Sequence, residues 1–254
     1  MANCNVISHR GSNRIAPQNT LPAFRQSIIY RADGFETDVH MSADGIPVIC
    51  HNYEVDETSD GKGEITSIML EDLKELDFGS YFHPSYKGTR IPTLEEFLLL
   101  CEKANLKILN IEIKPPKNHQ YDVVEKTIDA VKAHGLFDKL IISSFDPDAL
   151  LASKAYDVAC KTAFLYCPNK FASIKYFWEA VNFAKDIYAD ALHPHKAYIS
   201  KKYVEAAHEA GLMINPWTIN TEKEIIRCLD CGVDSVITDV PNFARKVIDE
   251  YNKR

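Results

Sequence analysis

The sequence lacks the features that mark a membrane, secreted or nucleic-acid-binding protein. No apolar run reaches the roughly 18 residues of a membrane-spanning helix, and no basic leader with an apolar stretch opens the chain, so we expect a cytoplasmic protein without stable membrane insertion. Lys and Arg number 29 against 36 Asp and Glu, and the formal charge of −7 opposes loose binding to nucleic acid. An anionic small-molecule partner would therefore need a local cluster of cations.

The cysteines form no disulfide pattern. There are seven, an odd number scattered mostly through apolar stretches, which fits reduced thiols in a core. Cys228 and Cys231 have the spacing of a redox or zinc motif, but no second Cys or His pair accompanies them. We therefore interpret this pair as structural.

Short β-branched runs alternate with amphipathic segments of helical period, a pattern typical of parallel βαβ units. Eight strands are predicted, at residues 5–8, 34–39, 107–113, 139–143, 159–165, 187–192, 212–217 and 234–238. Helices are predicted at residues 20–31, 93–104, 121–134, 171–184, 200–210 and 221–229. Because no linker or repeat divides the chain, we predict one α/β domain over residues 1–254, a (β/α)8 TIM barrel, with a doubly wound open sheet as the alternative.

Polar residues close three of these strands, at the end where a parallel barrel gathers its catalytic groups. The first strand ends in His9 and Arg10. The second carries Glu36 and Asp38 on one side, and because their neighbours would lie against helices, both carboxylates are predicted to point into the barrel. A tight turn at residues 44–45 then predicts that the chain doubles back and brings His51 to the same rim.

The third strand places Glu112 and Lys114 on one face and stops at a double proline. In isolation this pair could be a plain salt bridge. Together with the other two strands, however, it brings three carboxylates, two histidines and two fixed cations to one end of the barrel.

This collection has a chemical logic. Carboxylate oxygens suit one hard divalent cation, Mg2+ or Ca2+, which would polarise a phosphoryl oxygen. Arg10 offers a bidentate fork for phosphate, and Lys114 offers a second charge. His9 and His51 can act as general base and general acid on opposite sides of an in-line displacement. The sequence therefore predicts hydrolysis of a phosphodiester.

The same residues stand within motifs that run through the whole chain. They are His9-Arg10-Gly11, Pro17-Gln18-Asn19-Thr20, Glu36-Thr37-Asp38-Val39, Asp44-Gly45, His51-Asn52, Glu112-Ile113-Lys114, Trp217-Thr218-Ile219-Asn220 and Thr238-Asp239-Val240-Pro241. In these motifs the sequence resembles the glycerophosphodiester phosphodiesterase family. The resemblance implies a TIM-barrel enzyme that hydrolyses glycerophosphodiesters to glycerol 3-phosphate and an alcohol. It also implies metal binding by Glu36, Asp38 and Glu112, acid/base catalysis by His9 and His51, phosphate binding by Arg10 and Lys114, a further hydrogen bond from Asn19, and packing beside the glycerol by Trp217.

The sequence departs from that family in three places. Gln18 stands where Glu is common, and Asn52 stands where Asp is common; the usual basic residue just after His51 is also missing. Every implied catalytic and metal-binding residue is kept. The departures therefore concern the substrate pocket and the surroundings of His51.

Two other functions stay open. A phospholipase-type relative would cut an intact lipid headgroup, although the acidic composition and the lack of an amphipathic membrane-binding segment oppose it. A non-catalytic sensor would bind a glycerophosphodiester without turnover, although binding alone would not need two histidines. The roles of acid and base also stay open between His9 and His51, as does the choice between direct attack by water and a cyclic phosphate.

Residues 52–90 interrupt the alternation, because they are too many for an ordinary connection between a strand and its helix. We expect a small inserted cap, with one short helix indicated by the spacing of Met69, Leu73 and Leu76. Residues 53–90 contain nine acids, four bases and several aromatic side chains. We predict a lid that contacts the alcohol group and favours cationic or neutral groups over anionic ones, with a solvated surface subdomain as the alternative.

Overall fold

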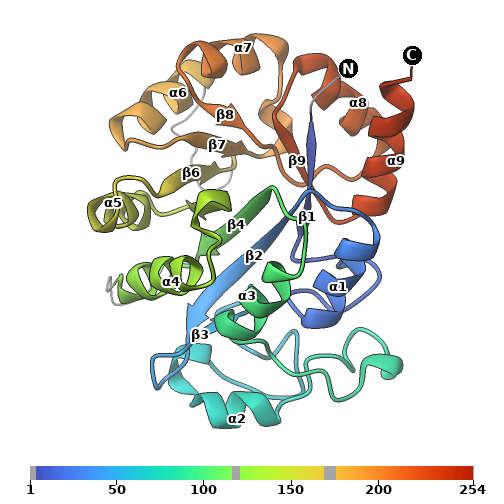
Figure 1. Cartoon of the computed structure of the whole chain (residues 1–254), viewed down its shortest axis with the longest axis vertical. Coiled ribbons are helices and arrows are strands. Elements are labelled where there is room, and N and C mark those ends of the chain that lie inside the picture. Colours follow the sequence, from blue (N-terminus) through green and yellow to red (C-terminus); the bar gives the residue numbers. More distant parts are fainter. Residues whose placement is uncertain (1–3, 116–120, 169–175, 254) are drawn as a thin grey trace.

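A computed structural model describes residues 4–115, 121–168 and 176–253 of the chain. Parallel strands form a central barrel with helices around it (Figure 1). The barrel strands are β1 (Asn5–His9), β2 (Gly34–Met41), β4 (Ile108–Ile113), β5 (Leu140–Ser144), β6 (Lys161–Tyr166), β7 (Ala191–Pro194), β8 (Met213–Ile214) and β9 (Ser235–Thr238). The surrounding helices are α1 (Leu21–Ile29), α3 (Leu94–Glu102), α4 (Asp122–Ala133), α5 (Pro147–Tyr156), α6 (Phe177–Asp186), α7 (Lys201–Glu209), α8 (Glu222–Cys231) and α9 (Pro241–Tyr251).

The strand order is β8-β7-β6-β5-β4-β2-β1-β9. Backbone hydrogen bonds from Asp234 N to Ile214 O and from Ile237 N to Pro216 O, both 3.0 Å, bring the two ends of this sheet together. The predicted (β/α)8 TIM barrel is therefore confirmed, and the open sheet is excluded.

The main core lies between the strands and the helices. On β2, Phe35 and Val39 face outward and are fully buried, as the alternation of side chains requires. The Phe24 ring of α1 lies 5.5 Å from Phe35 and 4.5 Å from Phe97 of α3, centroid to centroid. Burial of each of these apolar side chains contributes about 1.5–3 kcal/mol to the stability of the fold. With these neighbours directed outward, Glu36 and Asp38 point into the barrel.

Some predicted boundaries are wrong. The seventh strand was expected to begin at Ile187, but α6 ends just before this residue and β7 begins at Ala191. Ile187 and Ala189 are buried within the connecting turn, so their apolar character imitates a strand. Residues 171–175 of the predicted sixth helix lie outside the described residues. The structure also contains α5 and α9, for which no helix was predicted.

The insertion has a small core of its own. β3 (Pro47–Ile49) pairs antiparallel with β2 and returns the chain to the rim, as predicted. It is followed by two 3-10 turns, η1 (Ile65–Ser67) and η2 (Pro84–Tyr86), and by the short helix α2 (Leu70–Glu75) between them. Leu73 of α2 is fully buried against the insertion and β3, whereas Met69 is 50% exposed and not part of the predicted apolar face.

Two further short 3-10 turns, η3 (Phe137–Lys139) and η4 (Lys196–Tyr198), connect barrel elements. Within the described ranges, the helices do not combine the length and the apolar character that crossing a membrane would require.

Candidate active site

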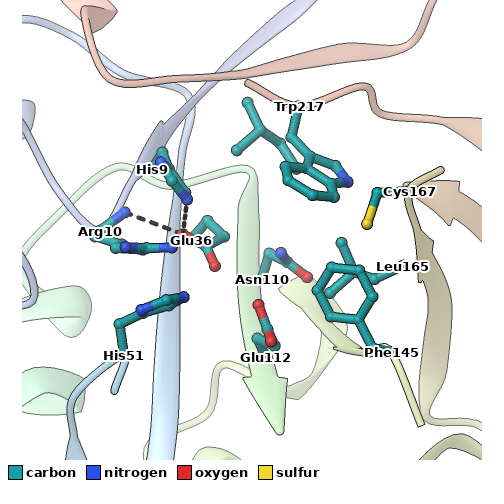
Figure 2. Close-up of a pocket in the computed structure, with 11 residues that line it drawn as sticks. His9, Arg10, Glu36, His51, Asn110, Glu112, Phe145, Leu165, Cys167 and Trp217 are labelled. Atoms are coloured by element: carbon teal, nitrogen blue, oxygen red, sulfur yellow. Dashed lines mark hydrogen bonds and ion pairs between the residues drawn. The ribbon is translucent and has the colours of Figure 1, made fainter. Parts of the chain in front are cut away.

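A cavity of about 270 Å³ opens at the C-terminal end of the barrel strands (Figure 2). The predicted site residues that line it are His9, Arg10, Glu36, His51, Glu112 and Trp217. Asn19, Asp38 and Lys114 do not line it, but they are buried and contact those residues or one another. The structure thus brings together all the residues that the sequence suggested.

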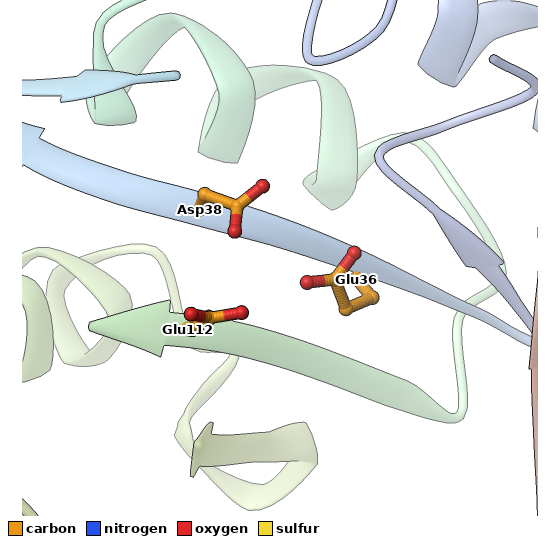
Figure 3. Close-up of side chains that lie close together, drawn as sticks. All are labelled: Glu36, Asp38 and Glu112. Carbon is orange, nitrogen blue, oxygen red and sulfur yellow. The ribbon is translucent and has the colours of Figure 1, made fainter. Parts of the chain in front are cut away.

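Three buried carboxylates form the centre of the site (Figure 3). The β2–β4 register places Asp38 opposite Glu112. Glu36 lies two residues before Asp38, on the same face of β2. One oxygen from each carboxylate lies within 4.8 Å of the others. Such crowding is unfavourable unless cations neutralise it.

Two side-chain cations lie against this group. Lys114 Nζ is 2.7 Å from Asp38 Oδ1 and 2.6 Å from Glu112 Oε1, and Arg10 Nε is 3.4 Å from Asp38 Oδ2. Asn19 Nδ2 donates to Asp38 Oδ2 at 2.8 Å. Burial alone would raise the pKa of Asp38, but the charges of Lys114 and Arg10 overcome it and hold this pKa well below its ordinary value. Of the three carboxylates, Asp38 is therefore the one whose charged form is favoured most.

The two glutamates differ from Asp38, because their pKa values are raised. Burial, reinforced by the charge of Asp38, raises the pKa of Glu36 well above its ordinary value. Burial also raises the pKa of Glu112, although Lys114 opposes the shift. Lys114 and Arg10 therefore do not offset the burial of all three carboxylates, and burial favours the protonated forms of Glu36 and Glu112. A bound cation would replace such a proton, and the oxygen-only donor set fits a hard divalent one.

His9 ends β1 and is held by a carboxylate from the last strand. Its Nδ1 lies 2.6 Å from Asp239 Oδ1, and its Nε2 lies 4.0 Å from Glu36 Oε2. Asn13 and Asn220 both donate to Asp239, which fixes the carboxylate. Burial and the neighbouring Arg10 lower the pKa of His9, while Asp239 opposes this shift by stabilising the imidazolium.

His51 follows β3 and is held by an amide instead. Its Nδ1 lies 2.5 Å from Asn52 Oδ1, and a ring nitrogen of His40 lies 3.3 Å from its backbone oxygen. Burial lowers the pKa of His51 to about 4, with Lys114 and Arg10 adding to the effect. His51 is therefore neutral at physiological pH.

The backbone after β1 is shaped to present Arg10. Its φ of 55° lies in the left-handed region, and its N–H donates to Glu36 Oε2 at 3.0 Å. A side chain at Gly11 would meet Ala23 Cβ at 2.7 Å, so only glycine fits there. Arg10 Nη1 donates to Gln18 Oε1, and the buried Nε faces Asp38 Oδ2 at 3.4 Å. The side chain as a whole lines the cavity, where its positive charge can face an anion.

Sequence reasoning missed several residues of the site. The cavity is also lined by Asn110, which lies on β4 beside Glu36 and Glu112, and by Phe145, Leu165, Cys167 and Ile237. Trp217 lines the cavity as well, with its ring 5.6 Å from Phe145 and its Nε1 donating to His193 O. The role of Asp239 was also missed, although it follows β9 at the rim, the same signal that identified His9.

The sequence matches the Glycerophosphoryl diester phosphodiesterase family over residues 9–243. It is 35% identical over 246 residues to the glycerophosphodiester phosphodiesterase of Caldanaerobacter subterraneus subsp. tengcongensis, covering 95% of this chain and 98% of that protein. The glycerophosphodiester phosphodiesterase of Bacillus subtilis is 30% identical over 261 residues, covering 97% of this chain and 87% of the relative.

Solved structures agree with these relatives. A phosphodiesterase from Oleispira antarctica, solved in complex with the product sn-glycerol-3-phosphate, superposes with a TM-score of 0.88 at 30% identity and covers 96% of each chain. The fold, the carboxylate-lined cavity and these similarities have one explanation. The chain belongs to the glycerophosphoryl diester phosphodiesterase family and is a phosphodiesterase.

Proposed function

We propose that this enzyme hydrolyses glycerophosphodiesters to glycerol 3-phosphate and an alcohol, with one divalent cation and with His9 and His51 as its acid/base pair. The observation that carries the proposal is the single cavity lined by both histidines, Arg10 and two of the three clustered carboxylates. Its relative from Oleispira antarctica supports the same product, since it was solved with sn-glycerol-3-phosphate.

The cation would be held by Glu36, Asp38 and Glu112, and the chemistry it supplies is polarisation of a phosphoryl oxygen. Mg2+ and Ca2+ both suit these ligands. Arg10, which lines the cavity, would bind the phosphate together with Lys114, whose Nζ also pairs with Asp38 and Glu112.

Proton transfer falls to the two histidines, one of which takes a proton from the attacking hydroxyl while the other gives one to the leaving alcohol. Both bind a partner through Nδ1, to Asp239 and to Asn52 respectively, so each leaves Nε2 for the cavity. Phe145, Trp217 and their apolar neighbours face the carboxylates and offer a surface for the carbon skeleton of the glycerol.

The proposal is tested with glycerophosphocholine, glycerophosphoinositol and a nitrophenyl phosphodiester, each assayed with Mg2+, Ca2+ and EDTA. We expect turnover with Mg2+ or Ca2+ and none in EDTA. Phospholipid vesicles form a further arm, and faster cleavage of intact lipid would favour the phospholipase-type activity. Saturable binding of glycerophosphocholine without turnover would instead identify a sensor.

We further propose that the insertion acts as a lid toward the alcohol. The described residues that line the cavity include none from 53–90. The support for a lid therefore comes from contacts between the insertion and the segment that follows β1. The Tyr86 hydroxyl donates to Ile15 O at 2.9 Å, and burial raises the pKa of Tyr81 to about 12, although the nearby backbone of Gln18 opposes the shift. Tyr81→Ala should change the relative kcat/KM for choline and inositol substrates, with Tyr188→Ala as an exposed-tyrosine control. Unchanged ratios would leave the insertion a surface subdomain.

A cytoplasmic location is also proposed. All seven cysteines are unpaired and five are buried, a pattern that suits a reducing compartment.

A further inference from the structure

The insertion reaches His51 through a chain of two side chains. Asn52 Oδ1 lies 2.5 Å from His51 Nδ1, and Asn52 Nδ2 donates to Glu57 Oε2 at 2.6 Å. Asn52 directly follows His51, whereas Glu57 belongs to the insertion proper and is exposed. A solvent-facing carboxylate is thus connected to a histidine that lines the cavity.

The chemistry of an amide makes this connection directional. A carboxylate accepts hydrogen bonds and does not donate them, so Glu57 selects the orientation in which Asn52 turns its NH2 group outward. The carbonyl oxygen then faces His51, and because it only accepts, Nδ1 of neutral His51 must carry the hydrogen. The lone pair is left on Nε2, the ring nitrogen available to the cavity.

The main chain around His51 is fixed independently. His40 binds the His51 carbonyl, and the Tyr53 ring packs edge-on against His40 with centroids 5.0 Å apart. The Tyr53 hydroxyl donates to Pro115 O at 2.9 Å, beyond the end of β4. These contacts fix the main chain at His51. They do not determine which ring nitrogen of His51 carries the hydrogen.

We propose that Glu57 is a positioning residue that sets the tautomer of His51 by fixing the orientation of the Asn52 amide. The kinetic consequence rests on the proposed function, in which His51 exchanges a proton with the substrate. His9 needs no such device. Its partner Asp239 is a carboxylate whose two oxygens are equivalent as acceptors, so either orientation gives the same tautomer.

This difference supplies the decisive experiment. Glu57→Ala should lower kcat by about 3- to 10-fold with KM nearly unchanged, the range expected for one lost orienting hydrogen bond. Glu57→Gln should keep most of the activity, because its carbonyl oxygen still accepts from Asn52. Glu54→Ala, which removes an exposed acid from the same segment, serves as the matched control and should not change kcat.

The Glu57→Ala change is also made in a second protein, the Asn52→Asp variant. A carboxylate at this position accepts from His51 in both orientations, so Glu57 has nothing left to orient. Glu57→Ala should therefore cost activity with Asn52 present and cost none in the Asn52→Asp background. Equal losses in the two backgrounds would show a general structural role and overturn the proposal, as would no loss in either.

The tautomer itself is read from 15N chemical shifts of the imidazole in the metal-loaded protein. We expect His51 to be protonated at Nδ1, and we expect Glu57→Ala to add a population protonated at Nε2. The same spectrum in both proteins would overturn the proposal. This measurement needs no turnover, so a failure of the proposed enzymatic function appears only in the kinetic arm and leaves the spectroscopic result decisive.

Discussion

Among single residues, the two histidines differ in what holds them. Asp239 presents a charge to His9, whereas Asn52 presents a neutral carbonyl to His51. A carboxylate stabilises an imidazolium more strongly than an amide does. We therefore expect the two rings to favour different protonation states.

We expect His9→Ala and His51→Ala each to lower kcat by on the order of 10^2 to 10^4, as loss of a general acid or base does. The melting temperature should change little, because both rings lie at the cavity rather than in the core. The variant that lacks the general acid should recover on a nitrophenyl diester, whose leaving group departs without a proton. Equal losses for both variants on both substrates would contradict the division of roles.

Asp239→Asn tests the partner of His9. It removes the charge that opposes the lowering of the His9 pKa, so this pKa should fall further. The limb of the pH–rate profile that reports His9 should move to lower pH, and kcat should fall by roughly 10- to 1000-fold. Profiles recorded between pH 5 and 9 measure both effects. A profile at the wild-type position would show that Asp239 is not coupled to His9.

The individual site residues were largely predictable, because polar side chains that close apolar strands stand out in a sequence. Glu36, Asp38 and Glu112 were found in this way. Cavity-wall residues such as Phe145 and Leu165 were not, since an apolar side chain at a strand end gives no signal that separates it from the core.

Among the secondary-structure elements, α8 carries a testable cap. The Thr221 hydroxyl accepts from Glu224 N, and the Glu224 carboxylate accepts from the backbone N–H groups of Thr221 and Asn220 and pairs with Lys196 at 2.7 Å. Burial would raise the pKa of Glu224, but the Lys196 ammonium and these backbone donors lower it from 4.5 to about 2.

The sign of the pH dependence follows from this lowered pKa. The contribution of Glu224 to the free energy of unfolding is complete above its ordinary pKa of 4.5 and is lost as the pH falls toward about 2. Glu224→Gln should therefore destabilise the protein by about 1 kcal/mol at pH 7, and the difference from wild type should shrink below pH 4. Urea unfolding at pH 7 and pH 3.5 measures this. A constant difference at both values would mean that charge is not what stabilises the cap.

The elements also show where sequence patterns fail. The β7 prediction began too early, because Ile187 and Ala189 are buried in a turn and periodicity does not distinguish a buried turn from a buried strand. The α2 prediction was right about the helix and wrong about Met69, whose exposed side chain happens to fall at a helical spacing from Leu73.

On the scale of the whole molecule, a bound cation should stabilise the fold. Because burial raises the pKa of Glu36 well above its ordinary value, cation binding must displace a proton from it, and affinity should increase with pH. Mg2+ or Ca2+ at 100 times its dissociation constant should add about 2.7 kcal/mol to the free energy of unfolding. Thermal melts in EDTA and in each metal, at pH 6 and pH 8, check both statements. Identical melting temperatures in EDTA and in metal would reject the site.

The closed barrel was predicted from eight alternating units, with an open sheet as the alternative, but the contacts that close it were not predictable. Closure depends on hydrogen bonds between residues 214–219 and 234–237, which no local pattern encodes. The lid prediction for the insertion rested on its acidic and aromatic composition and stays a prediction. The contact of Glu57 with Asn52, beside His51, gave no signal in the sequence.

The pairing of His9 with Asp239 joins the first strand of the barrel to the end of the last one. During translation, His9 leaves the ribosome long before Asp239 has been made, so a nascent chain has its histidine without the carboxylate that holds it. The last strand must be synthesised and docked between β1 and β8 before this pair exists. A prematurely terminated chain that lacks β9 therefore has no carboxylate partner for His9, and we expect hydrolysis to begin only when synthesis of the barrel is finished.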